Sequence, residues 1–116
     1  MIGKLDNYLR FNETALSLRS QRQELLASNI ANADTPNFKA RDIDFGAALS
    51  SMEGGNQGGV AGAMKYRVPL QTSMDGNTVE LNEEQTAFAE NAVQYQTTLS
   101  FLNGRIAQVT RALKGE

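Results

Sequence analysis

The chain has 116 residues, a formal net charge of −2, no cysteine and no histidine. Its length allows one small domain with a limited core, and the near-neutral charge argues against a nucleic-acid partner. Without cysteine or histidine, disulfides, thiolate metal sites and imidazole acid–base chemistry are excluded, so we expect no metal, no cofactor and no catalytic residues.

The first ten residues lack the apolar segment of a signal peptide. No apolar run in the chain approaches the roughly 20 residues of a membrane helix. We therefore expect no direct membrane insertion. The chain is predicted either to stay in the cytoplasm or to be exported by a route that needs no cleaved signal peptide.

Residues 1–33 are predicted to form an N-terminal helix with two adjoining apolar stripes. The stripes consist of Leu5, Leu9, Leu16, Leu26 and Ile30, and of Tyr8, Phe11, Ala15, Leu18 and Leu25. Two stripes can face two partners, or one partner and a core. Arg19 and Arg22 interrupt both stripes and are interpreted either as interfacial charges or as solvated cations, the usual state of surface arginines.

The end of this helix is predicted from a Thr-Pro pair. Pro36 disfavours helical backbone at Thr35 and has no N–H to donate. Just before it, Asn29 and Asn32 are poor helix formers. One interpretation is that they fray and cap the helix; the other is that their amides bond to the following loop, or to a neighbouring subunit, and fix the exit angle.

Residues 34–80 are predicted to form an irregular or small β region without its own core. Its candidate elements are a short piece anchored by Ile43, Phe45 and Leu49, a glycine-rich linker at 54–62, an extended piece at 66–69, and a turn at Asp75–Gly76 before Thr78–Val79. The centre could also form a small hairpin. Its acidic residues are not expected to bind a metal, because the loop glycines of a calcium site are missing.

Residues 81–116 are predicted to form a C-terminal helix with a coiled-coil seam. The apolar spacing alternates between four and three residues, and the seam residues are Phe88, Tyr95, Leu99, Leu102, Ile106, Val109 and Leu113. Asn82 is the predicted N-cap, and Gly115 the predicted stop. The seam could be the core of an intramolecular antiparallel hairpin with the first helix, or it could pack against other subunits.

An isolated helix is marginally stable in water, since packing of its apolar face supplies most of its stability. We therefore expect both terminal helices to be partly unfolded in the monomer and to become fully helical on assembly.

Residues 29–38 have the sequence NIANADTPNF. This segment resembles the signature of flagellar rod and hook proteins, whose usual form is Asn-x-Ala-Asn-x-x-Thr-Pro-Gly-Tyr. Segments 18–26, 39–45, 75–79 and 88–95 are similar to the proximal-rod members of that family. The residues that carry the signature, and that the resemblance marks for assembly, are Asn29, Asn32, Thr35, Pro36, Asn37 and Phe38.

The resemblance implies a structural subunit of the bacterial flagellar basal body, located in the periplasmic rod, which is both a drive shaft and an export conduit. Such a subunit would be exported unfolded through the flagellum's own secretion channel. Its implied partners are other rod subunits, the adaptor protein FliE, the membrane ring and the export gate. The resemblance implies no small-molecule substrate.

The chain departs from the family signature at two positions. Asn37 replaces a glycine, and asparagine tolerates left-handed backbone better than most residues. Phe38 replaces a tyrosine and loses its hydroxyl. Two other function classes stay open: a soluble helical adaptor or chaperone that binds a partner helix through the heptad face, and a small enzyme, which the missing catalytic residue types disfavour.

Overall fold

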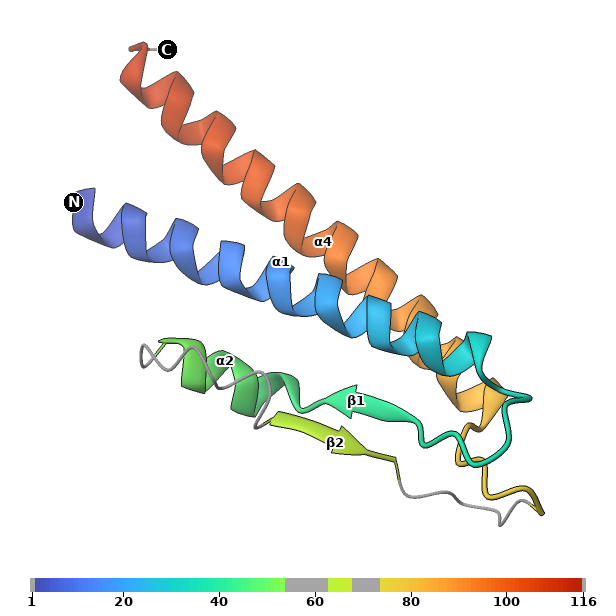
Figure 1. Ribbon diagram of the computed structural model, residues 1–116. Helices are drawn as coiled ribbons and strands as arrows, with labels where there is room; N and C mark the ends of the chain where they lie inside the picture. The colour runs from blue at the N-terminus through green and yellow to red at the C-terminus, as the bar shows by residue number, and fades with distance from the viewer. Residues whose placement is uncertain (1, 54–62, 68–73, 116) are drawn as a thin grey trace.

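The computed structural model describes residues 2–53, 63–67 and 74–115. Two long helices dominate it, α1 (Ile2–Ala31) and α4 (Leu81–Leu113), and they run antiparallel (Figure 1). The predicted fold class, mainly α with the terminal helices packed as a hairpin, is confirmed. The glycine-rich linker predicted at 54–62 lies outside the described residues.

The part of the sequence between the two long helices forms a small layer, which we call the middle layer after its place in the sequence. Strand β1 (Arg41–Ile43) pairs antiparallel with β2 (Met64–Tyr66), and helix α2 (Phe45–Glu53) follows β1 directly. The predicted extended piece overlaps β2 only at Tyr66; its last two residues lie outside the described parts of the chain. The strands form at 41–43 and 64–66, whereas residues 75–78 bond to the turn that follows α1.

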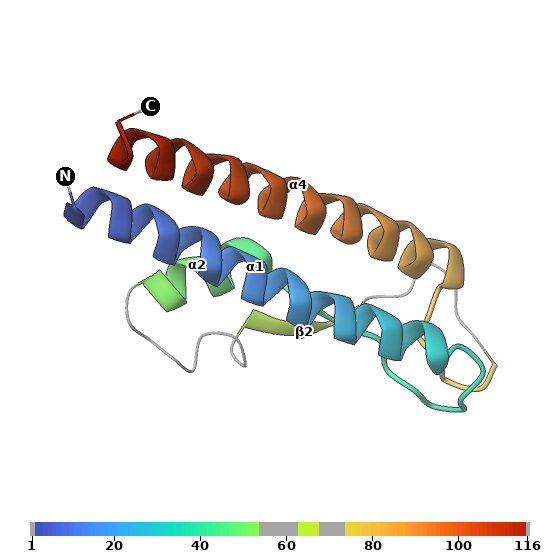
Figure 2. The same ribbon diagram turned by 90° about the horizontal axis from the view of Figure 1, so that it is seen from above.

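Helix α1 is the central element of the molecule. Helix α4 covers one side of it, and α2 with the β strands covers the other (Figures 1 and 2). Leu18 belongs to a buried cluster with Ile43, Ala48 and Ala63, and Leu25 packs against that cluster. The stripe of α1 that carries Leu18 and Leu25 therefore serves an internal core.

The two long helices meet at the end where the chain turns and diverge toward the two termini (Figure 1). The molecule is elongated, with extents of 65 × 27 × 17 Å. Both helices are continuous in the single chain. The expected partial unfolding of the monomer stays a prediction for a hydrogen-exchange measurement.

The ends of α4 correct one sequence prediction and confirm another. The helix begins at Leu81, after the extended residue Glu80, so Asn82 is not its N-cap. The Glu84 N–H donates to the Glu80 carbonyl at 2.9 Å, and the Glu84 side chain lies on the buried side of the helix. At the other end Gly115 has a φ of 76° and donates its N–H to Ala112, as expected for a glycine stop.

No helix in the described residues combines the length and the apolar character needed to cross a bilayer.

Candidate assembly site

A buried carboxylate fixes the place where α1, the β strands and α4 meet. Glu84 is fully buried on α4. Its Oε2 accepts a hydrogen bond from Asn29 Nδ2 at 2.9 Å, and its Oε1 accepts one from Arg67 Nε at 2.5 Å. Arg67 also donates to Asp42 Oδ2 at 3.0 Å, and Asp42 binds Arg22 through both oxygens, at 2.9 and 3.1 Å. We call these five residues the Glu84 cluster.

Charge balance keeps this cluster ionic. Burial lowers the pKa of Arg67, but the hydrogen bond and charge of Glu84, together with the charges of Asp42 and Glu83, hold that pKa above its ordinary value. A partly buried cation with these partners has its charge compensated and its donors used. The cluster therefore locks the middle layer and the start of α4 onto the end of α1.

Asn29, the first signature residue, is 1% exposed and joins α1 to β1. Its Nδ2 donates to the Arg41 carbonyl at 2.7 Å, and its Oδ1 accepts from the Arg41 N–H at 3.1 Å. A side-chain amide that pairs both ways with a backbone amide fixes position and direction. Of the interpretations considered for Asn29, the structure shows the bond to the following loop.

Asn32 acts locally. Its Nδ2 donates to the Ser28 carbonyl at 2.8 Å, and its Oδ1 accepts from the Thr35 hydroxyl at 3.0 Å. The Ser28 carbonyl also accepts the Asn32 N–H at 3.0 Å, so the Asn32 side chain bonds only within the last turn of the helix and to the residue before Pro36. For Asn32 the capping interpretation therefore describes the structure.

Asn77 completes the end of α1 from a distant part of the chain. Its Nδ2 lies within hydrogen-bond distance of three carbonyl oxygens, at 2.9 Å from Asn32, 3.0 Å from Ala33 and 2.7 Å from Thr35. The last carbonyls of a helix need such donors. The segment leading into α4 is thus attached to the residues that end α1.

The rest of the signature forms the turn between these attachments. Asn37 has a φ of 62°, the left-handed backbone expected where the family has glycine. Its N–H donates to Asp75 at 2.8 Å, and the Phe38 carbonyl accepts from Thr78 at 2.9 Å. Pro36 and Asn37 are exposed, whereas Phe38 is half-buried. The signature and residues 75–78 therefore form one hydrogen-bonded corner.

The predicted seam residues share one side of α4 but differ in burial. Five of them are partly buried, namely Phe88, Tyr95, Leu99, Leu102 and Val109. Ile106 and Leu113 are 45% and 83% exposed, while Val109 between them is partly buried; the two long helices diverge toward this end (Figure 1). The structure thus brings the first part of the seam against α1 and leaves its end open.

A groove of about 670 Å³ lies between the diverging ends. Its lining includes Leu5 and Tyr8 from α1 and Val109 and Leu113 from α4. The guanidinium of Arg105 stands over the Tyr8 ring, 5.4 Å from its centre, a cation–π contact of modest strength at an exposed site. The groove presents apolar side chains of both terminal helices to the outside.

The two arginines in the middle of α1 bond to other parts of the chain, so the interpretation that they are merely solvated is wrong. Arg22 belongs to the Glu84 cluster. Arg19 lies over the Phe45 ring at 4.1 Å and donates to Gln94 at 2.6 Å. Burial, with a smaller effect from Arg22, lowers the pKa of Arg19. Both cations therefore have internal roles.

Sequence reasoning missed three polar residues of this site, Asn77, Glu84 and Asn91, all of them buried. Glu84 and Asn91 alternate with Phe88 and Tyr95 at the same four–three spacing that marks the seam. If polar residues are included in the heptad pattern, the pattern contains the line of residues that packs on α1, namely Glu84, Phe88, Asn91 and Tyr95.

Comparison with known proteins identifies the family to which this chain belongs. The family model described as flagella basal body rod protein matches residues 9–39, most of α1 and the whole signature. The flagellar basal body rod protein FlgB of Proteus mirabilis is 44% identical, with 98% of both chains covered. FlgB of Cereibacter sphaeroides is 50% identical, with 88% of this chain and 90% of the relative covered.

This chain belongs to the FlgB family of flagellar basal body rod proteins. It is a structural subunit of the rod, and the alternative of a soluble adaptor is not supported. The FlgB relative from Escherichia coli, at 44% identity over 98% of both chains, agrees. The family assignment rests on nearly the full length, so it includes α4 and the middle layer as well as the signature.

Proposed function

We propose that this rod subunit assembles in the periplasm by packing the open ends of α1 and α4 against neighbouring subunits. The observation that carries this proposal is the groove between the diverging helices, where Leu113 is 83% exposed, together with Ile106, which is 45% exposed on the same part of α4 outside the groove lining. Apolar side chains at coiled-coil spacing lose water contact when a further helix covers them. The chemistry is noncovalent assembly and involves no catalysis.

The implied neighbours are other rod subunits, the adaptor FliE, the membrane ring and the export gate, and the implied route to the periplasm is the flagellum's own secretion channel, without a cleaved signal peptide. What supports these proposals is the similarity of the chain, over nearly its full length, to flagellar basal body rod proteins.

We further propose that the signature residues act as an angle-setting corner. Asn29, Asn32 and Asn77 fix how α1 leaves the turn and how α4 returns. Because both helices extend far from this corner, a small change of angle there moves the open ends by a larger distance. Assembly would then depend on residues that touch no neighbour.

The test is complementation of a strain that lacks its own proximal-rod protein. Ile106→Asp should abolish swimming and rod assembly, since a charge would be placed on the packed surface, while circular dichroism of the purified chain stays unchanged. Ser100→Asp, an exposed position on the same helix, is the control and should restore swimming. Normal rods from Ile106→Asp would contradict the proposal.

A further inference from the structure

The two ends of the elongated molecule carry charge of opposite sign. The end with both termini, which we call the basic end, includes residues 2–10 and 105–115, with five basic side chains and one acidic one. The end where the chain turns, which we call the acidic end, includes residues 31–39 and 74–84, with five acidic side chains and one basic one. The two ends lie at opposite limits of the long axis, which measures 65 Å (Figure 1).

The groove at the basic end combines an apolar lining with two cations. Lys4 and Arg105 lie on its walls together with Leu5, Val109 and Leu113, and both cations are exposed. None of the described residues that line the groove is acidic. A segment that fills it must therefore offer apolar side chains together with carboxylates, because a further cation would be repelled.

The acidic end has this complementary composition. Met74 is fully exposed there, and Leu81 is 44% exposed. Asp34, Asp75 and Glu83 are exposed at the same end of the molecule. The acidic end therefore presents apolar side chains beside carboxylates, the combination that the groove requires.

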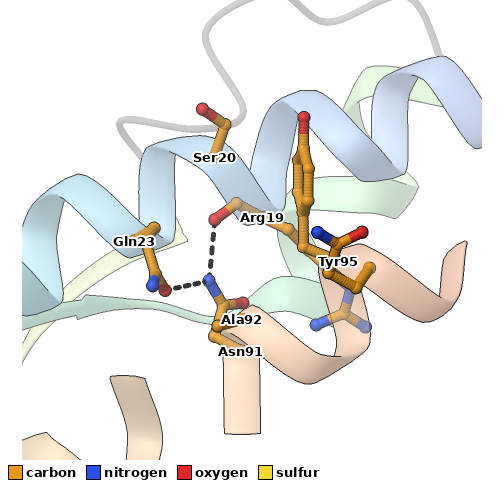
Figure 3. Close-up of a pocket in the computed structure, with 7 residues that line it drawn as sticks. Arg19, Ser20, Gln23, Asn91, Ala92 and Tyr95 are labelled. Carbon is orange, nitrogen blue, oxygen red and sulfur yellow. Dashed lines mark hydrogen bonds between the residues drawn. The ribbon is translucent and has the colours of Figure 1, made fainter. Parts of the chain in front are cut away.

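Bonds midway along the two long helices join the walls of the groove to one scaffold. Asn91 is fully buried there, and its Nδ2 donates to the Arg19 carbonyl at 2.8 Å and to Gln23 Oε1 at 2.7 Å (Figure 3). Beyond these bonds the helices diverge toward the termini (Figure 1). The groove is thus already formed in the single chain, which lowers the cost of receiving a partner.

We propose that the groove receives the corner of the adjacent rod subunit along the shaft, an apolar turn flanked by carboxylates like the acidic end of this chain. The inference rests on the proposed function and names the occupant of the groove. A subunit with a groove at one end and its complement at the other makes a head-to-tail contact, and such contacts extend into open filaments when the rotation does not close. The charges at Lys4 and Arg105 then set the orientation of the incoming corner.

The first test reverses one charge on the groove. In the complemented strain, Arg105→Glu should reduce the number of rods per cell at least tenfold, because carboxylates would face carboxylates, whereas Arg105→Lys should leave the number unchanged. Arg111→Glu is the matched control and should assemble normally, since Arg111 is exposed on the same helix but lies outside the groove lining. Both glutamate variants should keep the circular dichroism of the unsubstituted chain. Equal rod numbers in these two variants would overturn the role of the groove cation.

The second test identifies the occupant with a photo-crosslinking residue at position 112, an exposed position in the groove lining. In assembled rods it should capture the carboxylate-bearing segment that leads into the C-terminal helix of a neighbour, the counterpart of residues 74–84. Capture of any other segment, or no capture, would overturn the head-to-tail contact. The Ile106→Asp strain separates this failure from failure of the proposed function: rods lost there, with another segment captured at position 112, would retain assembly through the open helix ends and refute only the occupant.

Discussion

Replacing Glu84 with alanine removes the acceptor at the centre of the Glu84 cluster. The fully buried carboxylate accepts two hydrogen bonds, at 2.9 Å from Asn29 and 2.5 Å from Arg67. A hydrogen bond to a charged group contributes about 1.5–3 kcal/mol, so the pair contributes about 3–6 kcal/mol. Arg67 keeps Asp42, and Asn29 keeps the Arg41 carbonyl, so we expect a net loss of about 3 kcal/mol.

The assay is urea unfolding of the purified monomer, followed by far-ultraviolet circular dichroism. A loss of that size also lowers the Tm by about 12 °C, at about 4 °C per kcal/mol for a chain of this length. Glu83→Ala is the control, because Glu83 is 42% exposed and lies 3.4 Å from the same arginine, so its loss should stay below about 1 kcal/mol. Equal losses at positions 83 and 84 would refute the reasoning.

Leu18→Ala should lower the free energy of unfolding by about 3 kcal/mol, since Leu18 is fully buried, whereas Leu113→Ala should stay within about 0.5 kcal/mol; a reversed order in the same urea titration would contradict the core assignment. Gly76→Ala should cost about 1–3 kcal/mol, because Gly76 has a φ of 76° and its new Cβ would collide with the Asn37 side chain. Asn37→Gly should recover part of that loss, and strictly additive Tm changes would exclude the collision. The Ala47 N–H and Lys65 hold the pKa of Asp44 below its ordinary value, so the stability that Asp44 contributes is present above the unfolded pKa and is lost as the pH falls through the folded one. The difference in unfolding free energy between the unsubstituted chain and Asp44→Asn should therefore shrink below about pH 4, and a difference independent of pH would contradict this.

Local signals in the sequence were sufficient for the long elements. Apolar spacing predicted both helices, the Thr35–Pro36 pair marked the corner after α1, and Asn37 was expected in the left-handed backbone that it adopts. Each of these features depends on a residue and its close neighbours.

The polar interior could not be predicted in the same way. Asn77 bonds to carbonyls more than 40 residues earlier, and Asn91 bonds to Arg19 across 72 residues. Burial of a carboxylate or an amide depends on partners that arrive from elsewhere in the chain, and periodicity carries no information about them. The N-cap of α4 was also misplaced, since the helix begins at Leu81 after the extended Glu80, and no side chain caps it.

The separation between Asn29 and Glu84 is 55 residues, and this has a consequence for any chain that crosses a narrow channel as an extended thread. Whichever end emerges first, the bond between them can close only when both residues have reached the same side. Until then, the long helix that has left the channel lacks its partner in the Glu84 cluster. In a chain delivered this way, delivery would precede final folding, because the corner could form only after about three quarters of the chain had passed, from either end.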